Sequence, residues 1–248
     1  MRNFLLVLLI ISFASVAAQA QCINEDKIKY GGDFGSHNYT FFCPTYSFSY
    51  KGETSKKWGI LNPIDIRQVE ATILPVKNKV EQKIREFAGE SFFSRLEFYS
   101  VDIVYADSIA KFKGRVPEAE TAGCRGKYYF YYYFRADSKA AYCVGFAVDE
   151  KANIISPFNF PSKQDYKPID TTLTVCKVIE QSKRYSKKIT PIDKIEFEYD
   201  SKAKRFCWLI TQKLVAPRAG LNTRHQMVID AAEPAKVAIR KEQVHVSF

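Results

Sequence analysis

The sequence predicts an α+β fold in which two tandem units, each a helix followed by an antiparallel meander of strands, form one compact body. The phrase DSKAAYC at 137–143 reappears as DSKAKRFC at 200–207, and each copy follows an aromatic-rich run. A stretch with helical periodicity precedes each copy. With 46% hydrophobic and 15% aromatic residues the chain can fill a core, which excludes an intrinsically disordered protein.

Residues 1–20 predict an export signal. Arg2 precedes an apolar run that begins at Phe4, and Ala18-Gln19-Ala20 has the small-x-small pattern after which signal peptidases cleave. The run is shorter than the roughly 20 residues that a membrane-spanning helix needs, and no later segment approaches that length. We therefore expect a secreted or periplasmic protein with no integral membrane segment after cleavage.

Six cysteines in an exported chain predict disulfides. They are Cys22, Cys43, Cys124, Cys143, Cys176 and Cys207. The favoured pair is Cys22–Cys43, because these two bracket a turn-rich segment of the irregular lead-in, residues 21–63, that has little other means of holding itself in place. A contact or disulfide between Cys143 and Cys207 is an alternative, since both follow the repeated phrase.

The first unit, residues 64–155, begins with a predicted helix after Pro75. One apolar stripe supports it: Val76, Val80, Ile84 and Phe87. The preceding residues, IRQVEATIL, fit either a helix or a strand. Residues 95–106, RLEFYSVDIVYA, alternate with a period of two, which predicts a strand with Tyr99, Val101 and Ile103 on one face. An insertion is expected at about 107–123.

Two aromatic strands, 127–136 and 141–150, flank the first copy of the phrase, with a turn at Asp137–Lys139. The run of aromatics from Tyr128 to Phe134 places rings on both faces, so both faces should be covered. We expect the helix on one face, and either the second unit or an unknown partner on the other. Tyr129, Tyr131 and Tyr133 are the candidate binding residues, and a stripe inside a two-sided core is the alternative interpretation.

The second unit, residues 165–248, repeats this order. A helix is predicted within 171–188, with one arc formed by Val175, Val178, Ile179 and Tyr185. A hairpin with its turn at Ser201–Ala203 follows. Its core-facing residues are Ile195, Phe197 and Tyr199 on one strand and Phe206, Trp208 and Ile210 on the next. Three more short strands are expected in 224–232, 235–241 and 244–248.

These elements resemble known folds. A helix followed by an antiparallel meander is similar to cystatin-like folds, and the stretch IEFEYDSKAKRFCWLITQ at 195–212 with MVIDAA at 227–232 resembles the PepSY type of exported domain. The resemblance covers residues 170–240 well and 76–150 faintly. It implies a peptide- or protease-binding, inhibitory or accessory module. The Gln-x-Val-x-Gly loop of cystatins is absent, which argues against the inhibitor role, so no functional residue is carried over.

The function that the sequence favours is a non-catalytic exported binding or accessory protein that holds a peptide, a protein partner or a glycan. The alternative is a secreted hydrolase or other enzyme without a recognisable motif. The sequence contains no Gly-x-Ser-x-Gly, no His-Glu-x-x-His and no glycine-rich phosphate loop, so no catalytic residue and no cofactor is expected.

Metal and nucleic-acid partners are not expected either. The histidines His37, His225 and His245 lack ligand spacing, and there is no Cys-x-x-Cys. The net charge of +10 is spread along the chain, and its densest cluster, SKRYSKK at 182–188, is too small to form a nucleic-acid surface. A solvated helix face accounts for those lysines at this stage.

Overall fold

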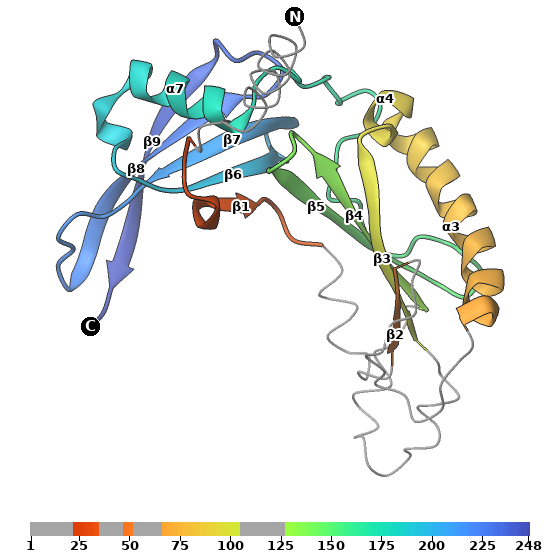
Figure 1. Ribbon diagram of the computed structural model, residues 1–248. Helices are drawn as coiled ribbons and strands as arrows, with labels where there is room; N and C mark the ends of the chain where they lie inside the picture. The colour runs from red at the N-terminus through yellow and green to blue at the C-terminus, as the bar shows by residue number, and fades with distance from the viewer. Residues whose placement is uncertain (1–21, 35–46, 52–65, 105–126) are drawn as a thin grey trace, which may run out of the picture.

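The computed structural model describes residues 22–34, 47–51, 66–104 and 127–248. Within them the protein is α+β, mostly sheet with few helices, which confirms the predicted class at that level. The strands form two sheets, in the orders β2-β3-β4-β5 and β1-β6-β7-β8-β9 (Figure 1). That the two halves are copies of one unit stays a prediction.

The first sheet is antiparallel and carries a long helix on one face (Figure 1). Its strands are β2 (Ser47–Tyr50), β3 (Leu96–Val104), β4 (Tyr128–Arg135) and β5 (Ala141–Val148). The helix is α3 (Ile66–Ala88), followed by the single turn α4 (Glu90–Phe93). The predicted hairpin therefore forms, and its turn lies at residues 136–140 as expected.

Helix α3 is longer than the sequence predicted. It begins at Ile66, so IRQVEATIL is helical, and Pro75 lies inside the helix at an exposed position. Val80 and Ile84 are buried as expected, whereas Phe87 is 39% exposed. The buried stripe continues from Ile84 to the next residue one turn on, Ala88, which leaves Phe87 at the edge of the contact.

The second sheet is antiparallel except for its short first strand. Its strands are β1 (Ile28–Tyr30), β6 (Ile192–Asp200), β7 (Arg205–Gln212), β8 (Gly220–Asp230) and β9 (Val237–Val246), and β1 runs parallel to β6. The single turns η1 (Glu25–Lys27) and η2 (Lys187–Ile189) flank this sheet. Two long strands, β8 and β9, replace the three short ones that were expected.

Helix α7 (Val175–Tyr185) lies over the second sheet (Figure 1). Val175, Val178 and Ile179 are buried as predicted, but Tyr185 is 53% exposed. The helix ends at Tyr185, so its ring leaves the arc that the preceding turns bury.

The two sheets share one hydrophobic core. The rings of Phe134 on β4 and Phe206 on β7 stack with their centroids 4.5 Å apart, and Phe92 of α4 stacks on Phe134 at 4.8 Å. The ring of Phe197 on β6 lies parallel to both of these, 5.2 Å from Phe206 and 6.1 Å from Phe134. Burial of these rings from both halves makes the core continuous across the boundary between the sheets.

Strand β1 joins the sheets through Gly31. The Gly31 N–H donates to the Ala141 carbonyl, and the Cys143 N–H donates to the Gly31 carbonyl, both at 2.9 Å, while β1 pairs with β6 on its other side. A Cβ at position 31 would lie 1.7 Å from the carbonyl oxygen of Phe197. Only glycine therefore fits between β5 and β6 at this point.

The disulfide joins Cys22 to Cys176, so the predicted Cys22–Cys43 pair is wrong. The reason is β1, which carries the N-terminal segment to the second sheet and places Cys22 beside α7 instead of folding it back on the lead-in. Cys43 and Cys124 lie outside the described residues.

Cys143 and Cys207 are free and buried, so no disulfide links them. They lie on β5 and β7, with β6 between those strands. Burial raises the pKa of the Cys143 thiol to about 11 and that of the Cys207 thiol to about 12. Both are therefore protonated, unreactive thiols at neutral pH.

No helix within the described residues is long and apolar enough to cross a lipid bilayer.

Candidate functional site

The aromatic residues of β4 divide between two environments. Phe130, Tyr132 and Phe134 face the core beneath α3 and are at most 1% exposed. Of the predicted binding residues, Tyr131 and Tyr133 are half-buried on the opposite face, whereas Tyr129 is only 1% exposed. The structure therefore brings Tyr131 and Tyr133 to an accessible surface, and Tyr129 does not contribute to it.

The opposite face of β4 is covered in part by the chain's own N-terminal segment. The Phe34 ring lies 4.8 Å from Tyr131 and 5.7 Å from Tyr133, and Tyr30 lies 5.1 Å from Tyr133. The sequence did not predict that the N-terminal segment supplies these contacts, and the expectation of an unknown partner on this face stays a prediction. The segment passes so close to β5 that a Cβ at Gly145 would lie 1.7 Å from the Phe34 carbonyl oxygen.

A β-bulge adds Tyr99 to this surface. Phe98 pairs with Tyr132 and Ser100 with Tyr131, which leaves Tyr99 as the extra residue of β3. Its ring lies 4.9 Å from Tyr133 and stacks on Phe34 at 6.2 Å. Strict alternation predicted Tyr99 on the face of Val101, and the bulge reverses that placement.

We call Tyr30, Phe34, Tyr99, Tyr131 and Tyr133 the aromatic platform. Tyr30 and Tyr99 are its most accessible rings, at 44% and 38% exposed. No local sequence pattern places either residue on the platform, because Tyr30 reaches it through β1 and Tyr99 through a bulge.

Cations lie at two places on the platform. The Arg135 guanidinium lies 5.2 Å from the centroid of Tyr133 and 5.8 Å from that of Tyr30, a cation–π arrangement. It also donates to Glu97 at 2.6 Å, which raises its pKa, so it remains charged. Lys51 lies 4.6 Å from the Tyr99 ring centroid and donates to its hydroxyl at 3.1 Å.

The Tyr133 hydroxyl of the platform remains protonated at neutral pH, because burial raises its pKa to about 12. A protonated phenol both donates and accepts a hydrogen bond, so the platform combines apolar ring faces with polar edges.

A groove adjoins the platform. It has a volume of about 720 Å³ and is lined by Glu25, Ile28, Lys29, Tyr30, Ser138 and Lys139. Tyr30 belongs to both surfaces, so platform and groove form one continuous site. A volume of several hundred Å³ is in the range that small ligands and peptide side chains occupy.

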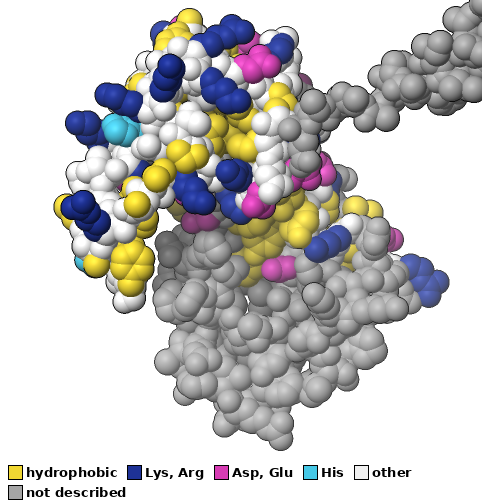
Figure 2. Space-filling view, turned by 60° about the vertical axis from the view of Figure 1, so that its left-hand side comes forward, with side chains coloured by type: hydrophobic (Ala, Val, Ile, Leu, Met, Phe, Trp, Pro, Cys, Tyr) yellow, Lys and Arg dark blue, Asp and Glu magenta, His cyan; other side chains and the backbone are white. Residues whose placement is uncertain are grey.

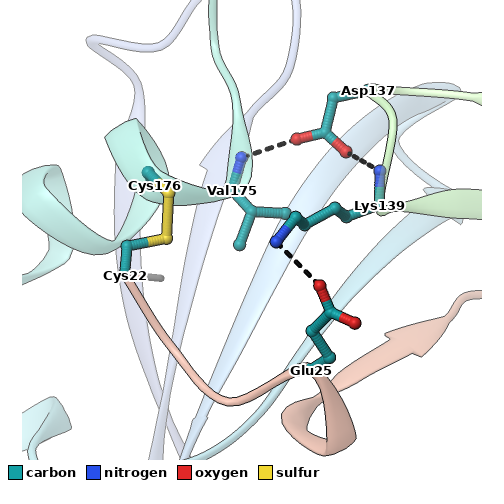
Figure 3. Close-up of a disulfide and its surroundings, with 6 residues drawn as sticks. All are labelled: Cys22, Glu25, Asp137, Lys139, Val175 and Cys176. Atoms are coloured by element: carbon teal, nitrogen blue, oxygen red, sulfur yellow. Dashed lines mark hydrogen bonds and ion pairs between the residues drawn. A yellow bond between two sulfur atoms is a disulfide. The ribbon is translucent and has the colours of Figure 1, made fainter. Parts of the chain in front are cut away.

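The wall of the groove is held by three segments that are far apart in the sequence (Figure 3). Lys139 of the β4–β5 turn pairs with Glu25 at 2.9 Å, and the disulfide fixes the N-terminal segment to α7. Asp137 completes the link: its Oδ1 accepts the N–H groups of Lys139 and Ala140, and its Oδ2 accepts the Val175 N–H, each at 2.8 Å.

Asp137 therefore also caps helix α7 from outside. Thr174 at the helix N-cap position makes no side-chain capping bond, and the carboxylate of Asp137 supplies the acceptor in its place. A negative charge at this end of a helix is favourable as well. The groove is thus preformed by contacts that do not depend on a ligand.

Among the described residues, no group of three or more His, Cys, Asp or Glu side chains is placed to hold a metal ion. The half-buried carboxyl of Glu198, whose pKa is raised mainly by burial, accepts the Gly32 N–H at 2.9 Å and so contributes to holding the N-terminal segment.

Comparisons with protein-family models, curated proteins and solved structures find no match for this chain. The resemblance to PepSY and cystatin-like domains accordingly stays a prediction. What the site does is inferred from its own geometry and charges.

Proposed function

We propose that this protein is a non-catalytic exported binding protein that holds an extended peptide segment of a partner across the aromatic platform and into the adjoining groove. The observation that carries the proposal is Tyr30. It is 44% exposed, packs edge to face against Tyr133 of the platform and lines the groove, so one ligand can contact both surfaces.

A peptide suits the chemistry of this site. Ring faces bind apolar side chains and prolines, while Tyr hydroxyls and Arg135 hydrogen-bond to peptide groups. Tyr and Arg are the residues on which protein interfaces depend most strongly, and a Tyr side chain loses little conformational entropy when it is ordered. The groove is lined by the acidic Glu25 and the basic Lys29 and Lys139. These side chains can accept hydrogen bonds from the N–H groups of a bound peptide and donate to its carbonyl groups.

Export is part of the same proposal. The Cys22–Cys176 disulfide is compatible with an oxidising compartment, where such bonds persist. The sequence of residues 1–20 supports a secreted or periplasmic location independently.

We also infer that the two halves are versions of one unit. The two turns support this: Asp200 Oδ1 accepts the N–H groups of Lys202 and Ala203 at 3.0 and 2.9 Å, the pattern seen at Asp137. Cys143 and Cys207 are each the third residue of the strand that follows. A common origin with PepSY or cystatin-like domains would account for this arrangement.

The test begins with selection of binding peptides from a displayed random library on the purified protein. A selected peptide is then titrated against Tyr30→Ala, Tyr99→Ala and Arg135→Ala. We expect each change to weaken the affinity by about tenfold or more, as for residues at the centre of an interface.

Matched controls come from the other half of the chain. Tyr185 is 53% exposed on α7 and Arg218 is an exposed arginine, so Tyr185→Ala and Arg218→Ala should leave the affinity unchanged. Failure to select any peptide, or an equal loss in the controls, would reject the proposal. Turnover of the bound peptide would instead favour the enzyme alternative.

A further inference from the structure

Cations gather where α7 ends. Lys183 and Arg184 occupy its last turn, Lys187 and Lys188 lie in η2, and all four are exposed. The exposed Lys213 joins them, because its backbone N–H donates to the Pro191 carbonyl at 2.7 Å. We call these five residues, together with Tyr185, the basic end of α7.

These cations have no carboxylate partners within the described part of the chain, unlike many others in the protein. Lys204 pairs with Asp165 at 3.0 Å, for example, and Lys194 with Glu196 at 2.7 Å. The nearest acid that follows in the sequence, Asp193, lies 3.6 Å from Arg224. On the face shown in Figure 2, Lys and Arg side chains are scattered over the described surface and outnumber the acidic ones.

A helix dipole explains only part of the cluster. Cations in the last turn of a helix are stabilised by its carboxyl end, and this accounts for Lys183 and Arg184. The effect falls off within one turn, so it does not account for Lys187, Lys188 or Lys213. The single acid of α7, Glu180, leaves the surface strongly positive.

We propose that the basic end of α7 is a docking surface for anionic phospholipid headgroups. Clusters of four to eight Lys and Arg are typical of segments that associate with acidic membranes. Tyr185 lies among the cations and is 53% exposed, and a Tyr ring is suited to the headgroup region because it has an apolar body and a polar tip.

A surface of many charges fits this cluster better than a single small anion does. The five side chains are exposed, and within the described ranges no hydrogen bond or ion pair holds them around one point. In this arrangement the lysine side chains keep their conformational freedom, and each contributes to binding through its proximity to the anionic membrane surface. The surface lies at the C-terminal end of α7, over the second sheet, whereas Tyr99, Tyr131 and Tyr133 of the platform lie on β3 and β4 of the first sheet (Figure 1). The two sites share no residue, so this inference stands independently of the peptide site.

The experiment measures co-sedimentation of the full-length protein with vesicles of phosphatidylcholine and phosphatidylglycerol at about 70:30, and with phosphatidylcholine alone. The test variant replaces Lys183, Arg184, Lys187 and Lys188 by Gln. Each charge near an anionic surface contributes about a fivefold factor, so we expect the removal of four charges to lower vesicle affinity by several hundredfold, roughly 600-fold.

The control variant removes the same charge from scattered exposed positions, namely Lys151, Lys163, Lys202 and Lys241, each changed to Gln. It should keep most of the vesicle binding, and a thermal melt of each variant reports whether the fold persists. Binding of the unchanged protein should require phosphatidylglycerol and weaken as salt is raised.

Any one of the following outcomes overturns the proposal. The unchanged protein fails to bind the anionic vesicles, or it binds both vesicle types equally, or both variants lose affinity to the same extent. Binding to heparin with no binding to vesicles also overturns it, and assigns the cluster to a soluble polyanion.

Discussion

The turns at 137–140 and 200–203 have the same sequence and differ in what surrounds them. In both turns the aspartate at the first position, Asp137 or Asp200, accepts hydrogen bonds from two backbone N–H groups of its own turn through Oδ1. The second oxygen of Asp137 caps helix α7, whereas that of Asp200 lies 3.6 Å from Arg240 at the surface. Identical local sequence thus produces the same turn, and tertiary position decides whether the turn also holds other elements together.

The largest expected effect is on the junction where the N-terminal segment, the first turn and α7 meet. Replacing Cys22 and Cys176 together by Ser should lower the free energy of unfolding by about 2–5 kcal/mol, because the bond closes a loop with a sequence separation of 154 residues. Hydrogen exchange should accelerate at Val175 and Lys139 before it does at Lys202 and Ala203. Equal acceleration at both turns would contradict the view that only the first is part of the junction.

Asp137→Ala should be next in size. It removes the acceptor of three N–H groups, one of which belongs to the first turn of α7, so we expect a loss of about 2 kcal/mol in urea denaturation. Helical content near 175–185 should fall as well. Asp137→Asn, which keeps the acceptor atom and loses the charge, should recover part of the loss.

Asp200→Ala should cost less, about 1 kcal/mol, because only two turn N–H groups and one long contact with Arg240 are lost. The same urea denaturation measures it. If Asp200→Ala proved as costly as Asp137→Ala, the cap on α7 would contribute nothing, and the comparison of the two turns would fail.

The smallest effect is on pH dependence. The N–H groups of Ala203 and Lys202, with Arg240, lower the pKa of Asp200. A lowered carboxyl pKa stabilises the folded state above the unfolded pKa of about 4, and that contribution is lost as the pH falls through the folded value. The difference in stability between the unchanged protein and Asp200→Ala should therefore be constant near pH 7 and shrink below about pH 4.

A pH-independent difference, measured by urea denaturation at several pH values, would show that the carboxylate charge of Asp200 does not matter to its turn. In that case Asp200 would stabilise the turn only as a hydrogen-bond acceptor.

Local patterns predicted the elements whose contacts are close in sequence. Both hairpins, their turns and the buried faces of β6 and β7 follow from alternation around the repeated phrase. Helix α7 follows from its apolar arc, and α3 in part from its stripe. In each case a residue and its main partners lie within a few turns or one hairpin of each other.

The candidate site was predicted only in part because its contacts are not local. Tyr131 and Tyr133 were identified from β4, but Tyr30 joins them across a separation of about a hundred residues and Tyr99 through a bulge. Cys22 pairs with Cys176 for the same reason, since nothing near Cys22 in the sequence indicates that β1 inserts beside β6. The insertion of a distant strand beside another leaves no periodic pattern in the sequence around either strand.

The position of Gly31 also sets an order of events during folding. The neighbours that enclose it, Tyr142 and Phe197, are synthesised long after it, so one of the first segments of the folded body to be made is among the last that can dock. Until then the backbone edges of β5 and β6 have no partner between them. The segment around Gly31 can therefore take its native place between β5 and β6 only after both of those strands have been synthesised.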